Sequence, residues 1–151
     1  MDNTIWCDTQ AVHIAVVVSD IEKVLKTYCR LFQTEMPAIK QTAVPETANV
    51  RYKGLPTPAR AKQSFLQFGR IRVEFLEPDE HDSTWREYLD RHGNIAHHIA
   101  FNVEDMGKAL SVLEEEGMEV IQSGNYNGGK YAYIESENEL GVMLELLQND
   151  K

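Results

Sequence analysis

The chain has 151 residues, 42% of them hydrophobic, and its formal net charge at pH 7 is −9. This size and apolar content suit one domain with a workable core, and the negative charge excludes a surface built to bind nucleic-acid phosphates. No apolar run approaches the length of a membrane span, and the first residues lack the basic and apolar regions of a signal peptide. We therefore expect a cytoplasmic protein without a membrane partner.

The first half of the chain predicts a strand, a helix and three further strands, which form a first module at about residues 10–78. β-Branched residues predict the strands, and apolar residues at helical spacing predict the helix. Ser19 or Asp20 is its expected cap, with Ser19 and Glu22 placed as a capping box. The expected segments are a strand at 11–18, a helix at about 20–31, and strands near 50–53, at 63–68 and at 71–77.

A second module with the same order of elements follows at about residues 96–148, after a linking helix at about 82–92. Asp105 is expected to cap its helix, which ends near Gly117. Its strands are expected at 96–103, near 119–122, at 130–135 and at 141–147. The chain, residues 1–151, is thus expected to be a single domain made of two βαβββ modules.

The two modules repeat each other in sequence at both ends. His13-Ile14-Ala15 recurs as residues 98–100, and Val73-Glu74-Phe75-Leu76 is answered by Leu144-Glu145-Leu146-Leu147. The displacement between the copies is larger at the start of the repeat than at its end, so the first module is longer. The proline-rich stretch at about 46–62 is the expected insertion, and long segments of this kind are often functional.

Alternation of side chains along each strand places one His and one Glu of each module on the face away from the predicted helices: His13, Glu74, His98 and Glu145. One such residue alone is usually structural or solvated, but four at matching places of a repeat predict a shared site. Two imidazoles and two carboxylates suit one divalent ion, Zn, Ni, Co or Mn, as the cofactor. His97 has the opposite parity, so we expect it to point away from His98 and to be structural or to support the ligands.

Basic residues gather in a stretch before Glu74 that contains no acidic residue. In an acidic chain this stretch could receive a phosphate or carboxylate of a substrate, and a solvated rim is an equal alternative for its arginines. We expect a small-molecule substrate, with an anionic compound as one alternative. The expected substrate-binding residues are two of the arginines and three residues of the second module: Arg70, Arg72, Asn102, Tyr131 and Tyr133.

These residues, in this order, resemble the vicinal oxygen chelate superfamily, which includes glyoxalase I, methylmalonyl-CoA epimerase, extradiol dioxygenases and resistance proteins for fosfomycin and bleomycin. The segments at 73–78, 92–101 and 140–146 look most like the methylmalonyl-CoA epimerase branch. The resemblance implies an α+β fold, in which two βαβββ modules form a cupped mixed sheet with helices on its outer face. It also implies a symmetric homodimer, and it leaves open whether the modules pair within one chain or across the dimer.

The resemblance implies a divalent-metal-dependent epimerase, isomerase or lyase that moves a proton next to a carbonyl through a metal-stabilised enolate. Glu145 or Glu74 would shuttle the proton; Glu46 is a weaker candidate, because its register across the insertion is unknown. The alternatives are a glyoxalase I-like lactoylglutathione lyase, a keto-sugar or keto-acid isomerase, a glutathione transferase-like resistance enzyme, and a resistance protein that binds a drug without chemistry. Extradiol dioxygenases use only one carboxylate, so the second Glu counts against oxygen chemistry.

Overall fold

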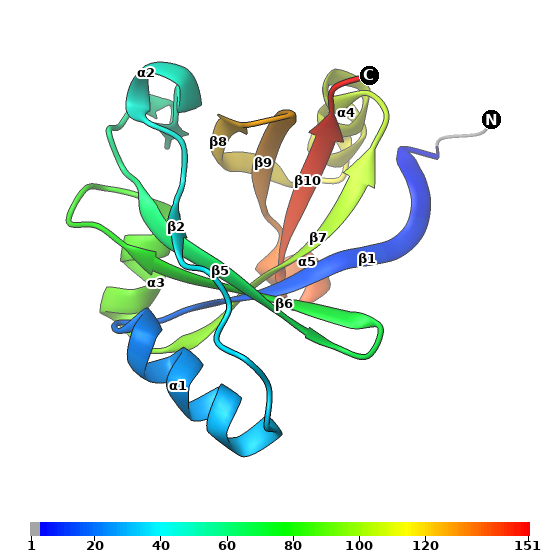
Figure 1. Ribbon diagram of the computed structural model, residues 1–151. Helices are drawn as coiled ribbons and strands as arrows, with labels where there is room; N and C mark the ends of the chain where they lie inside the picture. Colours follow the sequence, from blue (N-terminus) through cyan, green and yellow to red (C-terminus); the bar gives the residue numbers. More distant parts are fainter. Residues whose placement is uncertain (1–3) are drawn as a thin grey trace.

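One mixed sheet of ten strands is the centre of the computed structural model, which describes residues 4–151 (Figure 1). The strands are β1 (Trp6–Val17), β2 (Lys40–Gln41), β3 (Arg51–Tyr52), β4 (Leu55–Pro56), β5 (Ala61–Phe68), β6 (Ile71–Pro78), β7 (Ile95–Val103), β8 (Glu119–Tyr126), β9 (Gly129–Glu135) and β10 (Met143–Asn149). The helices are α1 (Ile21–Phe32), α2 (Pro45–Ala48), α3 (Thr84–His92), α4 (Met106–Glu115) and α5 (Glu137–Leu140). Across the sheet the strands follow the order β2-β5-β6-β1-β7-β10-β9-β8-β3-β4.

The two modules meet at the middle of the sheet, where β1 runs antiparallel to β7 and Ile14 lies opposite Ile99. Within each module the first and last strands are parallel neighbours, β1 beside β6 and β7 beside β10. The four central strands are therefore the beginning and the end of both modules. This pairing joins the modules within one chain.

The helices α1 and α4 begin at equivalent aspartates. The Asp20 carboxylate accepts a hydrogen bond from the backbone N–H of Lys23, and the Asp105 carboxylate accepts one from Lys108, both at 3.0 Å. These bonds satisfy N–H groups that the first turn of a helix leaves without a partner. The predicted cap at Asp105 is confirmed, whereas the predicted capping box that starts at Ser19 is wrong, because the cap lies one residue later.

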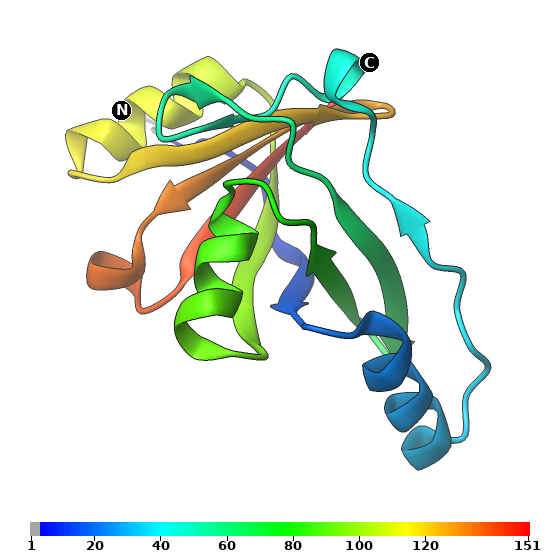
Figure 2. The same cartoon turned by 90° about the vertical axis from the view of Figure 1, so that its left-hand side faces the viewer.

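Apolar side chains pack on both faces of the sheet. On the outer face α1 packs on Phe75 of β6, and α4 packs on Leu146 of β10. The linking helix α3 packs on the inner face, where Trp85 and Leu89 contact a cluster that includes Val17. Figure 2 shows α3 standing apart from α1 and α4. Within residues 4–151 no helix has the length and apolar character of a membrane span.

The chain between β2 and β3, which includes the start of the proline-rich insertion, runs from one side of the sheet to the other. β2 pairs with β5 of the first module, and β3 pairs with β8 of the second module. We call residues 42–50, which include α2 and join these two strands, the strap. In Figure 2 this cyan to teal segment crosses the top of the molecule. The insertion was expected to hold one strand near 50–53 and otherwise a loop; β3 lies there, and its short hairpin with β4 is additional.

Candidate metal centre

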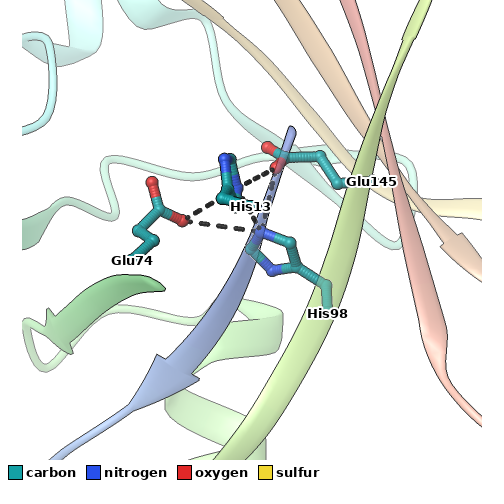
Figure 3. Close-up of side chains that lie close together, drawn as sticks. All are labelled: His13, Glu74, His98 and Glu145. Carbon is teal, nitrogen blue, oxygen red and sulfur yellow. Dashed lines mark hydrogen bonds and ion pairs between the residues drawn. The ribbon is translucent and has the colours of Figure 1, made fainter. Parts of the chain in front are cut away.

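Two histidines and two glutamates meet on the inner face of the four central strands: His13 of β1, Glu74 of β6, His98 of β7 and Glu145 of β10 (Figure 3). The strand register brings them together, because His98 and Glu74 both lie opposite Ala15, one on each side of β1. Ala100 of β7 has the same relation to His13 and Glu145. The residues that repeat in the sequence therefore also occupy equivalent positions in the sheet.

The ligand atoms of the four side chains are close together and buried. The Glu145 carboxylate lies 3.0 Å from the His13 Nε2 and 2.9 Å from the His98 Nε2, and the two Nε2 atoms are 3.1 Å apart. Glu74 is slightly further away, 3.6 Å from His13 and 3.5 Å from His98. The exposed fraction of each residue is 7% or less.

This donor set fits one divalent metal ion. Imidazole nitrogens and carboxylate oxygens bind such ions at about 2.0–2.2 Å, so ligands of one ion lie within roughly 4.4 Å of each other. Each imidazole Nε2 lies 2.9–3.6 Å from the two carboxylates, inside this limit, and both imidazoles turn Nε2 inward. A divalent ion would also balance two buried carboxylates, whose burial without a cation is costly.

Charge in the cluster shifts the pKa of two of its members in opposite directions. Burial by itself lowers the pKa of His98, but Glu145 and Glu74 outweigh it and raise this pKa to about 9. Burial by itself raises the pKa of Glu145, but His98 and His13 outweigh it and lower this pKa to about 2. At neutral pH an imidazolium therefore lies beside a carboxylate, and a bound metal ion would take over the positive charge.

One carboxylate of the cluster, Glu74, and one imidazole, His98, each contact a further polar side chain. The Gln63 side chain donates a hydrogen bond of 2.6 Å to the outer oxygen of Glu74. The Nδ1 of His97 lies 2.8 Å from the Nδ1 of His98, and its Nε2 lies 3.3 Å from the Thr84 hydroxyl. Burial, and then the charge of His98, lower the pKa of His97 well below its ordinary value, so a neutral ring can accept the N–H of His98.

The contact between His97 and His98 overturns the prediction that the two rings point apart. The register between β1 and β7 shifts at this point, since Ala15 lies opposite His98 but Val16 lies opposite Ala96. Such a shift inserts one unmatched residue into a strand and breaks the alternation of side chains. His97 is that residue, and its ring therefore turns toward its neighbour.

A cavity of about 710 Å³ opens beside the cluster, and three of the four candidate ligands line it, all except His98. Both modules and the strap form its walls. Among its lining residues are the aromatic side chains Phe65, Trp85, Tyr126, Tyr131 and Tyr133, and the amide side chains Gln41, Gln63, Asn102, Asn125, Asn127 and Asn149. A larger cavity, of about 790 Å³, lies between the β3–β4 hairpin and α3 and contains none of the cluster.

Four of the five residues expected to bind substrate line the cavity: Arg72, Asn102, Tyr131 and Tyr133. The fifth, Arg70, is exposed in the turn before β6 and is not part of the lining. Glu46, the weaker candidate for a base, is exposed on α2 and does not line the cavity. Burial, followed by the charge of Glu145, raises the pKa of Tyr133 well above its ordinary value, so its phenol stays protonated.

Sequence reasoning missed several cavity residues. Gln63 and Phe65 could have been found from the sequence, because they alternate along β5 on the face that also carries Glu74. For Lys40 and the strap residues Ala48 and Val50 the sequence contains no such pattern. Their positions depend on how the chain between β2 and β3 crosses from one side of the sheet to the other.

Comparisons with known proteins agree with this fold. The family model described as the Glyoxalase/Bleomycin resistance protein/Dioxygenase superfamily matches residues 12–134. The uncharacterized protein YqjC of Bacillus subtilis is 31% identical over 88 residues, which are 56% of this chain and 63% of that protein. The match thus spans less than two thirds of that relative.

Solved structures match nearly the whole chain. A hypothetical protein from Bacillus halodurans is 23% identical with a TM-score of 0.65, over 94% of this chain and 95% of that one. Methylmalonyl-CoA epimerase from Mycobacterium tuberculosis is 15% identical with a TM-score of 0.64, over 100% and 93%. A Streptomyces coelicolor methylmalonyl-CoA epimerase variant in complex with 2-nitronate-propionyl-CoA is 20% identical with a TM-score of 0.62, over 97% and 96%. At these identities the likeness concerns the fold, and the predicted α+β architecture is confirmed.

Proposed function

Since the chain belongs to the glyoxalase/bleomycin resistance protein/dioxygenase superfamily, we propose that it is a metal-dependent enzyme that moves a proton on a carbon next to a carbonyl. The observation that carries this proposal is the buried cluster of two imidazoles and two carboxylates beside a cavity. The similarity of this fold to that of methylmalonyl-CoA epimerases is compatible with an epimerase activity of this chain. Isomerase and lyase activities are the alternatives within the superfamily.

In this proposal His13, His98, Glu74 and Glu145 hold one ion of Zn, Ni, Co or Mn. Such an ion supplies a Lewis acid that polarises a carbonyl oxygen and lowers the cost of removing the neighbouring proton. The protein must then provide a group that accepts the proton and returns it, within hydrogen-bond reach of the substrate carbon.

We propose Glu74 as the group that accepts the proton. Its carboxylate lies further from both imidazoles than that of Glu145, and it lines the cavity. The hydrogen bond from Gln63 holds its outer oxygen. Glu145 lies closer to both imidazoles, 3.0 Å from the His13 Nε2 and 2.9 Å from the His98 Nε2, and in this proposal it serves as the fixed ligand.

The substitution Glu74→Gln tests this division of roles. Removal of a general base typically lowers a rate by about 10²–10⁴-fold, so we expect exchange of the substrate's α-hydrogen with deuterium to fall by this amount. The exchange is measured by NMR in D2O over a panel of acyl-CoA, hemithioacetal and keto-sugar compounds, and bound metal is measured by elemental analysis. For Glu145→Gln we expect a lower metal content as the primary effect.

Glu46→Gln is the matched control, because this glutamate is exposed on α2 outside the cavity. Its exchange rate and metal content should equal those of the unmodified protein. Full exchange by Glu74→Gln would show that another group takes the proton. A purified protein that binds none of the four ions would contradict the metal-dependent mechanism as a whole.

A further inference from the structure

Two cationic side chains, Lys40 of β2 and Arg72 of β6, line the cavity. Within residues 4–151, the ion pairs between basic and acidic side chains involve other lysines and arginines, and neither of these two has a carboxylate within 4.0 Å. In a chain with a net charge of −9, cations without a carboxylate partner are available to an anionic ligand.

The guanidinium of Arg72 is held in place by an aromatic ring. Its Cζ lies 3.8 Å from the centre of the Phe65 ring, a close cation–π contact. The same ring meets the His13 imidazole, with the two ring centres 6.0 Å apart and an angle of 67° between their planes. Phe65 thus lies between the metal cluster and the guanidinium. A guanidinium stacked in this way keeps its N–H groups directed outward in the plane.

The spacing between this cation and the cluster suits one small molecule. Arg72 and Glu74 are two residues apart on β6 and therefore share a face, with Cα atoms about 7 Å apart in an extended strand. A compound that reaches the cluster with its carbonyl oxygen could therefore extend along the same face of β6 toward Arg72.

The strap forms a fixed wall of the same cavity. Ala48 and Val50 of the strap line it and are 3% and 4% exposed. The strap is bonded at both ends, by Thr42 N–H to the carbonyl of Ala61 and by the carbonyl of Val50, which accepts from Thr57 N–H, and the Asn125 side chain donates to the carbonyl of Thr47 between them. A cavity of this size, about 710 Å³, with several amide side chains in its lining, is typical of sites for small polar ligands.

We propose that Arg72 is the anchor for the anionic group of a compact carbonyl substrate, whose carbonyl lies at the four-residue cluster. This inference rests on the proposed function. A carboxylate and a phosphate would both pair with the in-plane N–H groups of the guanidinium, and Lys40 would add a second positive charge. The substrate class is therefore a small keto acid or keto-sugar phosphate.

The test compares ligands that differ only in the anionic group. Levulinate is paired with 2-pentanone, and dihydroxyacetone phosphate with dihydroxyacetone, and the dissociation constant of each is measured by titration calorimetry on zinc-loaded protein. Arg72→Gln should weaken binding of the anionic compound by about tenfold or more, because a charge-assisted hydrogen bond is lost, and leave the neutral compound unchanged. The two anions distinguish a carboxylate from a phosphate.

Arg70→Gln is the matched control, since Arg70 is two residues away and exposed like Arg72 but does not line the cavity. It should bind all four compounds as the unmodified protein does. The proposal that Arg72 is the anchor is wrong if the anions bind no more tightly than the neutral compounds. It is also wrong if Arg72→Gln and Arg70→Gln have the same dissociation constants. Zinc content is measured separately: a protein without zinc whose anion binding still depends on Arg72 would contradict the proposed function and support the anchor.

Discussion

Two alanines provide the space in which the candidate metal ligands meet. Ala15 lies between Glu74 on one neighbouring strand and His98 on the other, and its side chain is fully buried. Ala100 occupies the equivalent position in the second module. The Cβ of each alanine points to the same face of the sheet as the ligands on the two neighbouring strands. A larger side chain at either position would therefore enter the cluster. This explains why His and Ala recur together in the sequence repeat.

At this scale His97 should control how tightly the ion is held. In His97→Phe the N–H of His98 loses its acceptor, and loss of such support typically lowers metal affinity by about 10–100-fold. Affinity is measured by competition with a chromogenic chelator. His92→Phe is the control, because His92 is an exposed histidine of α3. The prediction is wrong if both variants bind zinc equally; partial recovery in His97→Gln would support a hydrogen-bonding role.

The four candidate ligands could be predicted because strand alternation and a sequence repeat gave independent reasons for the same face. The contact of His97 could not, since a register shift interrupts the alternation at that residue. Arg70 and Arg72 show the same limit. Both have the parity of Glu74, but β6 begins at Ile71, so only Arg72 follows the strand geometry.

Among the elements, α1 and α4 show that the repeat extends to local interactions. Each begins with an aspartate whose carboxylate accepts the N–H of the third residue after it. We expect Asp20→Ala and Asp105→Ala each to lower the free energy of unfolding by about 1 kcal/mol, the usual effect of losing an N-cap. Urea denaturation followed by circular dichroism measures this change.

Ser19→Ala is the control for the first helix. Ser19 precedes the cap, and its backbone N–H, which the substitution keeps, donates to the Asn94 side chain. Its effect should stay within about 0.5 kcal/mol, as for most surface substitutions. A loss at Ser19 as large as that at Asp20 would restore the capping box that the sequence suggested.

The long strands and helices could be predicted from periodicity, whereas of the short elements between α1 and β5 only the strand at β3 was expected. β2, α2, β3 and β4 have two to four residues each, too few for a period to appear. The strands among them depend on pairing with β5 and β8, which belong to opposite halves of the sheet. Such pairing is decided by the whole fold, and the cavity wall formed by the strap was therefore beyond sequence reasoning.

For the whole molecule, the candidate metal centre links the two modules, because each contributes one histidine and one glutamate. Membership of the superfamily, which the sequence predicted, is confirmed, and the homodimer stays a prediction. An ion bound only by the folded chain stabilises it by about 2.7 kcal/mol at a free concentration 100 times its dissociation constant. Removal of the ion by a chelator should then lower Tm by roughly 5–10 °C, measured by scanning calorimetry.

Variants separate this effect from general changes in stability. In His13→Ala the chelator should no longer change Tm, whereas in His92→Ala, which alters a histidine outside the cluster, the difference should persist. An unmodified protein with the same Tm in zinc and in chelator would argue against an ion that joins the modules.

The central position of β10 has a consequence for synthesis of the protein. Glu145 is the last of the four candidate ligands in the sequence, and β10 pairs with β7 inside the sheet. A ribosome releases the chain from its amino end first, so the nascent protein contains three of the four ligands well before the last one emerges. The complete coordination set therefore exists only once β10, the last of the four central strands in the sequence, has been synthesised.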